Sequence, residues 1–118
     1  MNRPAFTKLP DRSVEPIPDD LPGWTKTAGS PSMRTWIEYS SEDESLISGW
    51  WEATPGTYHA TYDDWEFVHM IEGRIVITAE GEEPGEVGPG DAFVIEAGFK
   101  GTWEIKENVL KHFVIQKK

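Results

Sequence analysis

The sequence predicts one all-β domain built as a sandwich or barrel, and three observations support this fold class. The chain has 118 residues, a length suited to one domain with its own core. β-branched and aromatic residues occur in short runs separated by turn residues, roughly every 8 to 12 positions. No segment carries apolar residues at the roughly 3.6-residue spacing of an amphipathic helix. Regular short strands without helices are typical of β-sandwiches and β-barrels.

The strands are predicted from residue 33 onward. Gly73 separates the fourth strand from the fifth, and the turn Gly88-Pro89-Gly90-Asp91 precedes the sixth. The predicted strands span residues 33–39, 46–53, 57–62, 66–72, 74–79, 92–95, 99–105 and 109–115.

Residues 1–32 differ in composition from the rest of the chain. They hold six of the nine prolines and show no apolar periodicity. Proline lacks a backbone N–H and fixes φ, so it is excluded from helix interiors and from central strands. We therefore predict an extended Pro-rich N-terminal arm over residues 1–32, which crosses the surface of the domain or of a partner subunit, and a β-barrel domain over residues 33–118.

Charge and composition exclude several classes of function. Eleven Lys and Arg against 21 Asp and Glu give a net charge of −10, which would repel nucleic acid. No stretch approaches the roughly 20 apolar residues needed to span a membrane, and the N-terminus has no apolar run that could act as a secretion signal. The absence of cysteine excludes disulfides and thiolate metal sites. We expect a cytoplasmic protein without nucleic-acid or membrane partners.

Two segments resemble the paired motifs of the cupin family. In the first cupin motif, a His-x-His pair precedes a Glu by three or four residues, and a Gly follows the Glu after six more. Glu66 and Gly73 have this separation, with His59 at the first histidine position and Thr61 at the second.

The second motif resembles residues 90–103. In cupins, Gly-Asp opens a strand, Pro-x-Gly turns the chain, and a histidine follows three positions later. Here Glu96 replaces the usual proline, Gly98 supplies the turn, and Gly101 occupies the histidine position. Both motifs in this order resemble one cupin group in particular, which is named after the ureidoglycine aminohydrolase cupin domain. The resemblance covers roughly residues 46–116 and implies an RmlC-like cupin jelly-roll barrel that forms a homodimer, since cupins commonly pair through such arms.

The resemblance also implies four metal ligands, of which only His59 and Glu66 remain. A tightly held transition metal usually has at least three protein ligands. We therefore expect no metal and no cofactor, because a divalent metal at these two residues would require donors from elsewhere.

Strand parity tests which side chains can meet inside the barrel. If Glu66 faces inward, His69 faces outward, and Trp103 faces inward on its own strand. On the last strand either Lys111 or His112 faces inward, and parity leaves both open because both sides are apolar. The family resemblance favours Lys111, which would place a cation near Glu66.

Glu66 and Lys111 are therefore the predicted catalytic or ligand-contacting pair. A buried, unpaired carboxylate is unfavourable and must find a cation, hydrogen-bond donors or a raised pKa. A purely structural pair is the alternative, and we expect a partly hydrated pair because a cupin interior normally opens at one end. The predicted substrate-binding residues are His59, Thr61, Phe93 and Trp103.

Three classes of function follow. The first is a metal-independent cupin that binds or transforms a small polar molecule, with a nitrogen-containing group or a carboxylate; Glu66 would be the general base and Lys111 would hold an anionic group. The second is a metal-dependent aminohydrolase-like enzyme, and the third is a non-catalytic small-molecule sensor or binding module.

Overall fold

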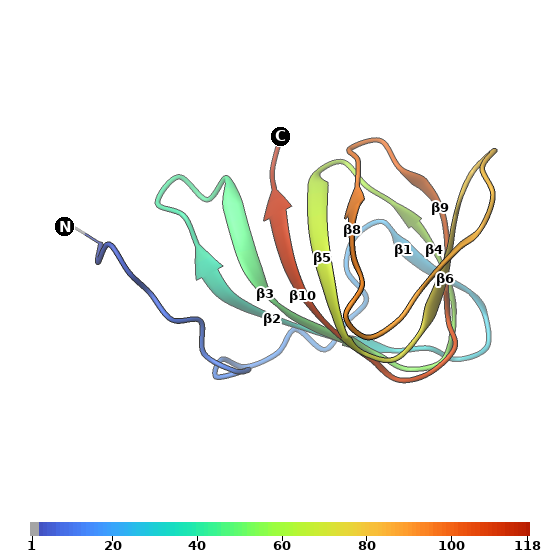
Figure 1. Cartoon of the computed structure of the whole chain (residues 1–118), viewed down its shortest axis with the longest axis horizontal. Helices are drawn as coiled ribbons and strands as arrows, with labels where there is room; N and C mark the ends of the chain where they lie inside the picture. The colour runs from blue at the N-terminus through green and yellow to red at the C-terminus, as the bar shows by residue number, and fades with distance from the viewer. Residues whose placement is uncertain (1–2) are drawn as a thin grey trace.

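The computed structural model describes residues 3–118 and contains two antiparallel sheets of five strands that face each other (Figure 1). The first sheet has the order β1-β4-β9-β6-β7 and the second β2-β3-β10-β5-β8. Within residues 3–118 no helix is long and apolar enough to cross a membrane. The strands are β1 (Trp24–Ala28), β2 (Met33–Ser40), β3 (Leu46–Ala53), β4 (Gly56–Thr61), β5 (Trp65–Glu72), β6 (Ile75–Ala79), β7 (Gly85–Val87), β8 (Ala92–Ile95), β9 (Lys100–Ile105) and β10 (Val109–Gln116).

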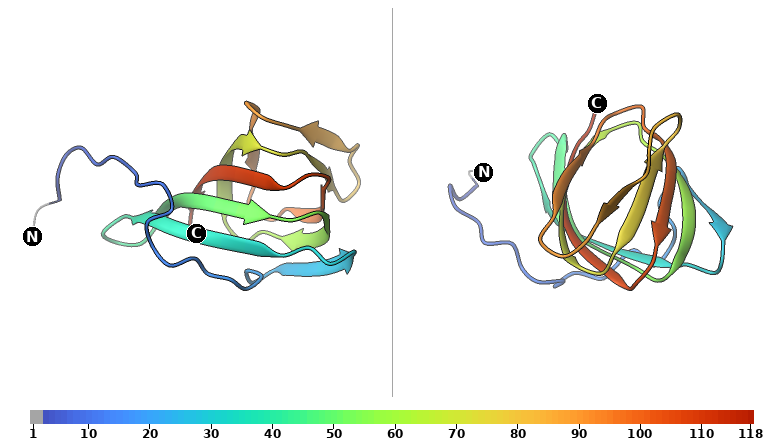
Figure 2. Two further views of the ribbon diagram at one scale, coloured as in Figure 1. Left: turned by 90° about the horizontal axis from the view of Figure 1, so that it is seen from below. Right: turned by 45° about the vertical axis from the view of Figure 1, so that its right-hand side comes forward.

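The eight predicted strands are confirmed, with boundaries that differ by at most one residue at either end. The two sheets enclose a barrel of the cupin jelly-roll type, as the right-hand view of Figure 2 shows. Its core lies between the inner faces of the sheets, where alternate side chains of each strand meet. The largest fully buried members of this core are Trp51, Trp103, Tyr58, Lys111, Met33, Met70, Ile75, Ile105 and Val68.

The predicted arm over residues 1–32 is too long. β1 lies inside that range and pairs with β4 at the edge of its sheet. Prolines 22 and 31 flank this edge strand, where a missing backbone N–H is tolerated. Trp24 explains why the segment joins the sheet, because its ring packs against Trp51 and Trp103 with centroids 5.5 and 5.0 Å apart.

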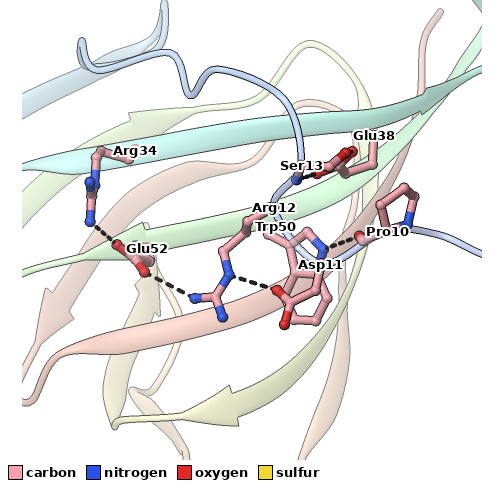
Figure 3. A network of polar contacts seen from close by, with 8 residues as sticks. All are labelled: Pro10, Asp11, Arg12, Ser13, Arg34, Glu38, Trp50 and Glu52. Carbon is pink, nitrogen blue, oxygen red and sulfur yellow. Dashed lines mark hydrogen bonds and ion pairs between the residues drawn. The ribbon is translucent and has the colours of Figure 1, made fainter.

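The N-terminal arm thus ends before β1, and its residues 10–13 lie on the outer face of the second sheet (Figure 3). The Arg12 guanidinium lies 5.4 Å from the centroid of the Trp50 ring and 5.9 Å from that of Trp36. It also donates to Glu52 at 3.2 Å, while the Trp50 indole N–H donates to the Pro10 carbonyl at 3.0 Å. The arm therefore covers two tryptophans that the sheet alone would expose.

Phe6, nearer the N-terminus than residues 10–13, is 83% exposed. The homodimer stays a prediction. Light scattering at high micromolar protein concentration checks it, and a chain that remains monomeric there would contradict it.

Arg12→Ala should loosen the arm. The substitution removes two cation–π contacts and the ion pairs with Asp11 and Glu52, all partly exposed, so we expect the free energy of unfolding to fall by about 1 kcal/mol. Limited proteolysis should then cut residues 3–13 faster than in the parent protein. Lys8→Ala, at an exposed position of the same arm, is the control, and equal cleavage rates in both variants would show that Arg12 does not fasten the arm.

Candidate functional site

A buried ion pair lies at the centre of the barrel. Lys111 on β10 is paired with Met70 on β5, and Glu66 on β5 is paired with Ile115 on β10, so both charged side chains face inward. The Lys111 Nζ donates to Glu66 Oε2 at 2.9 Å. Lys111 is 2% exposed and Glu66 is 3% exposed. The inward positions predicted for both residues are confirmed, and His112 faces the outer side.

Two tryptophans hold the Lys111 ammonium from the sides. Its Nζ lies 4.5 Å from the centroid of the Trp51 ring and 4.6 Å from that of Trp103. Burial lowers the pKa of Lys111, and the neighbouring Glu66 carboxylate opposes that shift. The indole faces and the carboxylate together compensate the ammonium for the water it has lost.

Tyr62, which follows β4, fixes the other carboxylate oxygen. Its hydroxyl donates to Glu66 Oε1 at 2.7 Å. Burial raises the pKa of Tyr62 well above its ordinary value, and the charge of Glu66 raises it further. Sequence reasoning did not identify this residue.

His59 and Thr61 lie on the outer face of β4, so their predicted substrate-binding positions do not reach the barrel interior. His59 is half-buried and its Nε2 lies 3.4 Å from Glu80 at the surface. Tyr58 and Ala60 are the inward-facing residues of this strand. The prediction placed the motif one residue out of register on β4, and a shift of one residue along a strand moves every side chain to the opposite face.

The cupin motif also allows three residues between its second histidine and its glutamate. With that spacing Ala60 and Tyr62 take the two histidine positions, both on the side of Glu66. Neither alanine nor Gly101 offers a metal donor, and a Cβ at Gly101 would lie 2.2 Å from the carbonyl oxygen of Thr78. The residues at the family's ligand positions therefore do not fit a metal centre. Nowhere in residues 3–118 do three or more Asp, Glu or His side chains gather in a way that could hold a metal ion.

Phe93 and Trp103 both lie within the barrel. Phe93 is half-buried and its ring centroid lies 5.9 Å from that of the fully buried Trp103. Phe93 also lines a groove of about 670 Å³ between β7 and β8, the edge strands of the two sheets. This groove is separate from the ion pair, since neither Glu66 nor Lys111 lines it.

A cavity of about 100 Å³ adjoins the ion pair. Thr35 lines it, is 2% exposed, and its Oγ1 has no hydrogen-bond partner among the described residues. An outer pocket of about 400 Å³ shares five lining residues with the cavity. The expectation of a partly hydrated pair is wrong, because Lys111 and Glu66 are both almost fully buried. Leu21 and Trp24 from the N-terminal segment line both the cavity and the outer pocket. The cavity is lined by Leu21, Trp24, Thr35, Ile37, Ile47, Trp51, Tyr62, Glu66, Lys111, Phe113 and Ile115.

The fold and the motif positions define a cupin. Residues 40–113 match the family model described as the EutQ-like cupin domain, and the chain belongs to this family. A comparison with curated proteins finds no match. The finer resemblance to the ureidoglycine aminohydrolase group stays a prediction.

Solved structures support the same fold. A protein of unknown function of the DUF861 family from Pseudomonas syringae has a TM-score of 0.72 at 23% identity, over 90% of this chain and 46% of that one. The EutQ protein of Clostridium difficile has a TM-score of 0.66 at 21% identity, over 75% of this chain and 70% of that one. A DUF861 family protein from Thermotoga maritima has a TM-score of 0.53 at 26% identity, over 54% of this chain and 73% of that one. The chain thus spans less than half of the Pseudomonas protein.

Replacing one member of the ion pair should be strongly destabilising. Glu66→Gln or Lys111→Met leaves a buried charge without its partner, and each should lower the free energy of unfolding by about 3–5 kcal/mol. The double variant should recover much of this loss, which urea denaturation would measure. The exposed Arg74–Glu86 pair, also at 2.9 Å, is a matched control whose coupling should not exceed about 1 kcal/mol. Additive effects at Glu66 and Lys111 would contradict a coupled pair.

Tyr62 should make the protein sensitive to high pH. Its pKa in the folded state lies above the 10.0 of an ordinary tyrosine, so the unfolded chain loses this proton first. The stability that Tyr62 contributes is present below pH 10.0 and is lost as the pH rises through the folded-state pKa. Tyr62→Phe should cost about 1–3 kcal/mol at neutral pH through the lost hydrogen bond. The variant should also flatten the alkaline fall in stability, and an unchanged slope would contradict this assignment.

Proposed function

We propose that this cupin binds a small polar molecule in the cavity beside Glu66 and Lys111. The proposal rests on the hydroxyl of Thr35, which lines that cavity and has no hydrogen-bond partner among the described residues. Native interiors pair nearly all of their buried polar groups, so such a hydroxyl indicates a hydrogen-bond partner that comes from outside the chain. A volume of about 100 Å³ accommodates roughly three water molecules or one small ligand.

The charges of the site favour an uncharged ligand. Glu66 already neutralises Lys111, so an anionic ligand would add a net charge to a site that water barely reaches. This argues against the predicted role of Lys111 as a holder of an anionic group. Glu66 retains free lone pairs on both oxygens and can accept a further hydrogen bond. If the molecule is transformed, Glu66 is the general base and Tyr62 orients it.

We also propose that no metal is held tightly. Ala60 and Gly101 provide no donor, and the Lys111 ammonium neutralises the one carboxylate at the family's ligand positions. Zinc, manganese, iron and nickel should therefore be bound weakly or not at all. Elemental analysis after dialysis checks this, and near-stoichiometric retained metal would favour the aminohydrolase-like alternative.

A thermal-shift screen tests the binding proposal. The screen should contain uncharged, anionic and cationic molecules of up to about six heavy atoms, including amino acids, ureides and small carboxylates. Thr35→Val should abolish the shift of any ligand that binds while leaving the unliganded protein as stable or more stable, because the hydroxyl it removes has no partner. Thr102→Val, on the outer face of β9, is the matched control. A ligand shift that survives Thr35→Val would place binding elsewhere.

A further inference from the structure

Lys111, Glu66 and Tyr62 are arranged as an activated nucleophile. An amine nucleophile needs a base within hydrogen-bond reach and a third group that orients the base. Lys111 Nζ lies 2.9 Å from Glu66 Oε2, and the Tyr62 hydroxyl lies 2.7 Å from Glu66 Oε1. The two contacts use different oxygens of the carboxylate, so they hold its plane and leave Oε2 aimed at the amine.

The surroundings of the Lys111 side chain can accommodate a protonated imine, which is the product of an amine and a carbonyl compound. An ammonium and a protonated imine carry the same single positive charge at the same nitrogen. The faces of Trp51 and Trp103, at 4.5 and 4.6 Å, and the Glu66 carboxylate would stabilise either cation. Converting one into the other therefore leaves the net charge of this buried site unchanged.

The cavity provides room for the carbonyl compound. Lys111 lines it together with aliphatic and aromatic side chains, among them Ile37, Ile47 and Phe113. The volume of about 100 Å³ fits a molecule of roughly four or five heavy atoms. Since an acidic ligand would leave the site with a net negative charge, the compound that fits is a small neutral aldehyde or ketone.

We propose that Lys111 forms a covalent imine with a small neutral aldehyde or ketone bound in this cavity. Glu66 first takes a proton from the ammonium, which frees the nitrogen lone pair. That lone pair attacks the carbonyl carbon, the C–O π electrons move onto the oxygen, and a proton passes from the attacking nitrogen to that oxygen to give a neutral carbinolamine. The hydroxyl then leaves as water with the proton held by Glu66, and a C=N bond forms. The inference rests on the proposed ligand site and adds the class of ligand and the bond it makes.

Reductive trapping tests the inference. The full chain is incubated with a few equivalents of acetone or propanal and sodium cyanoborohydride, which reduces an imine to a stable secondary amine. Peptide mapping by mass spectrometry should find the alkyl group on Lys111 at a level at least about tenfold above that on the exposed Lys106. Glu66→Gln should lower the rate of trapping at Lys111 by at least about tenfold, the low end of what a positioned base contributes.

Two controls separate chemistry from folding and from binding. Lys111→Arg keeps a cation beside Glu66 but has no nucleophilic amine, so it should fold and lose the selective adduct. Acetamide has the shape and neutrality of acetone but a carbonyl that amines do not attack. If acetamide binds by thermal shift and no adduct forms on Lys111, the imine proposal is overturned and the binding site stands. If neither compound binds and labelling is uniform over the lysines, the proposed function fails as well.

Discussion

The contact between the Lys111 ammonium and the Glu66 carboxylate is the interaction on which the interior of this protein depends. Both groups are almost free of water, so neither charge is tolerable without the other. The partners of the ammonium also come from both sheets, since Trp51 lies on β3 and Trp103 on β9. The Lys111 ammonium therefore links the two sheets at the centre of the barrel through electrostatic contacts. An apolar side chain at this position would link them through packing alone.

Aromatic side chains complete this arrangement and explain the high tryptophan content of a small domain. Three of the six tryptophans, Trp24, Trp51 and Trp103, form one cluster inside the barrel. Trp36 and Trp50 lie instead on the outer face beneath Arg12 of the arm. The same residue type thus fills the core and fastens the N-terminal segment, and Trp24 of that segment lines the cavity beside the ion pair.

The fold was predictable because the strands alternate and because two weak motifs occur in the right order. Glu66 was found from its motif position, and Lys111 from the family resemblance, because both sides of its strand are apolar and alternation alone did not separate it from His112. β1 and β7 were missed because a single inward tryptophan and a run of three residues carry too little periodicity. The first motif tolerates two spacings, and the wrong one put His59 and Thr61 at the positions that Ala60 and Tyr62 occupy. Thr35 could not be identified, because an unpaired hydroxyl is a property of packing.

The order of strands has a consequence for biosynthesis. β10 follows the other nine described strands along the chain, yet it lies between β3 and β5 in the middle of its sheet. A nascent chain that has not yet emerged from the ribosome beyond residue 108 would present β3 and β5 with unpaired edges and Glu66 without its cation. Such edges pair readily with other chains. The second sheet can therefore close only once β10 has left the ribosome, and until then the edges of β3 and β5 need protection from other chains.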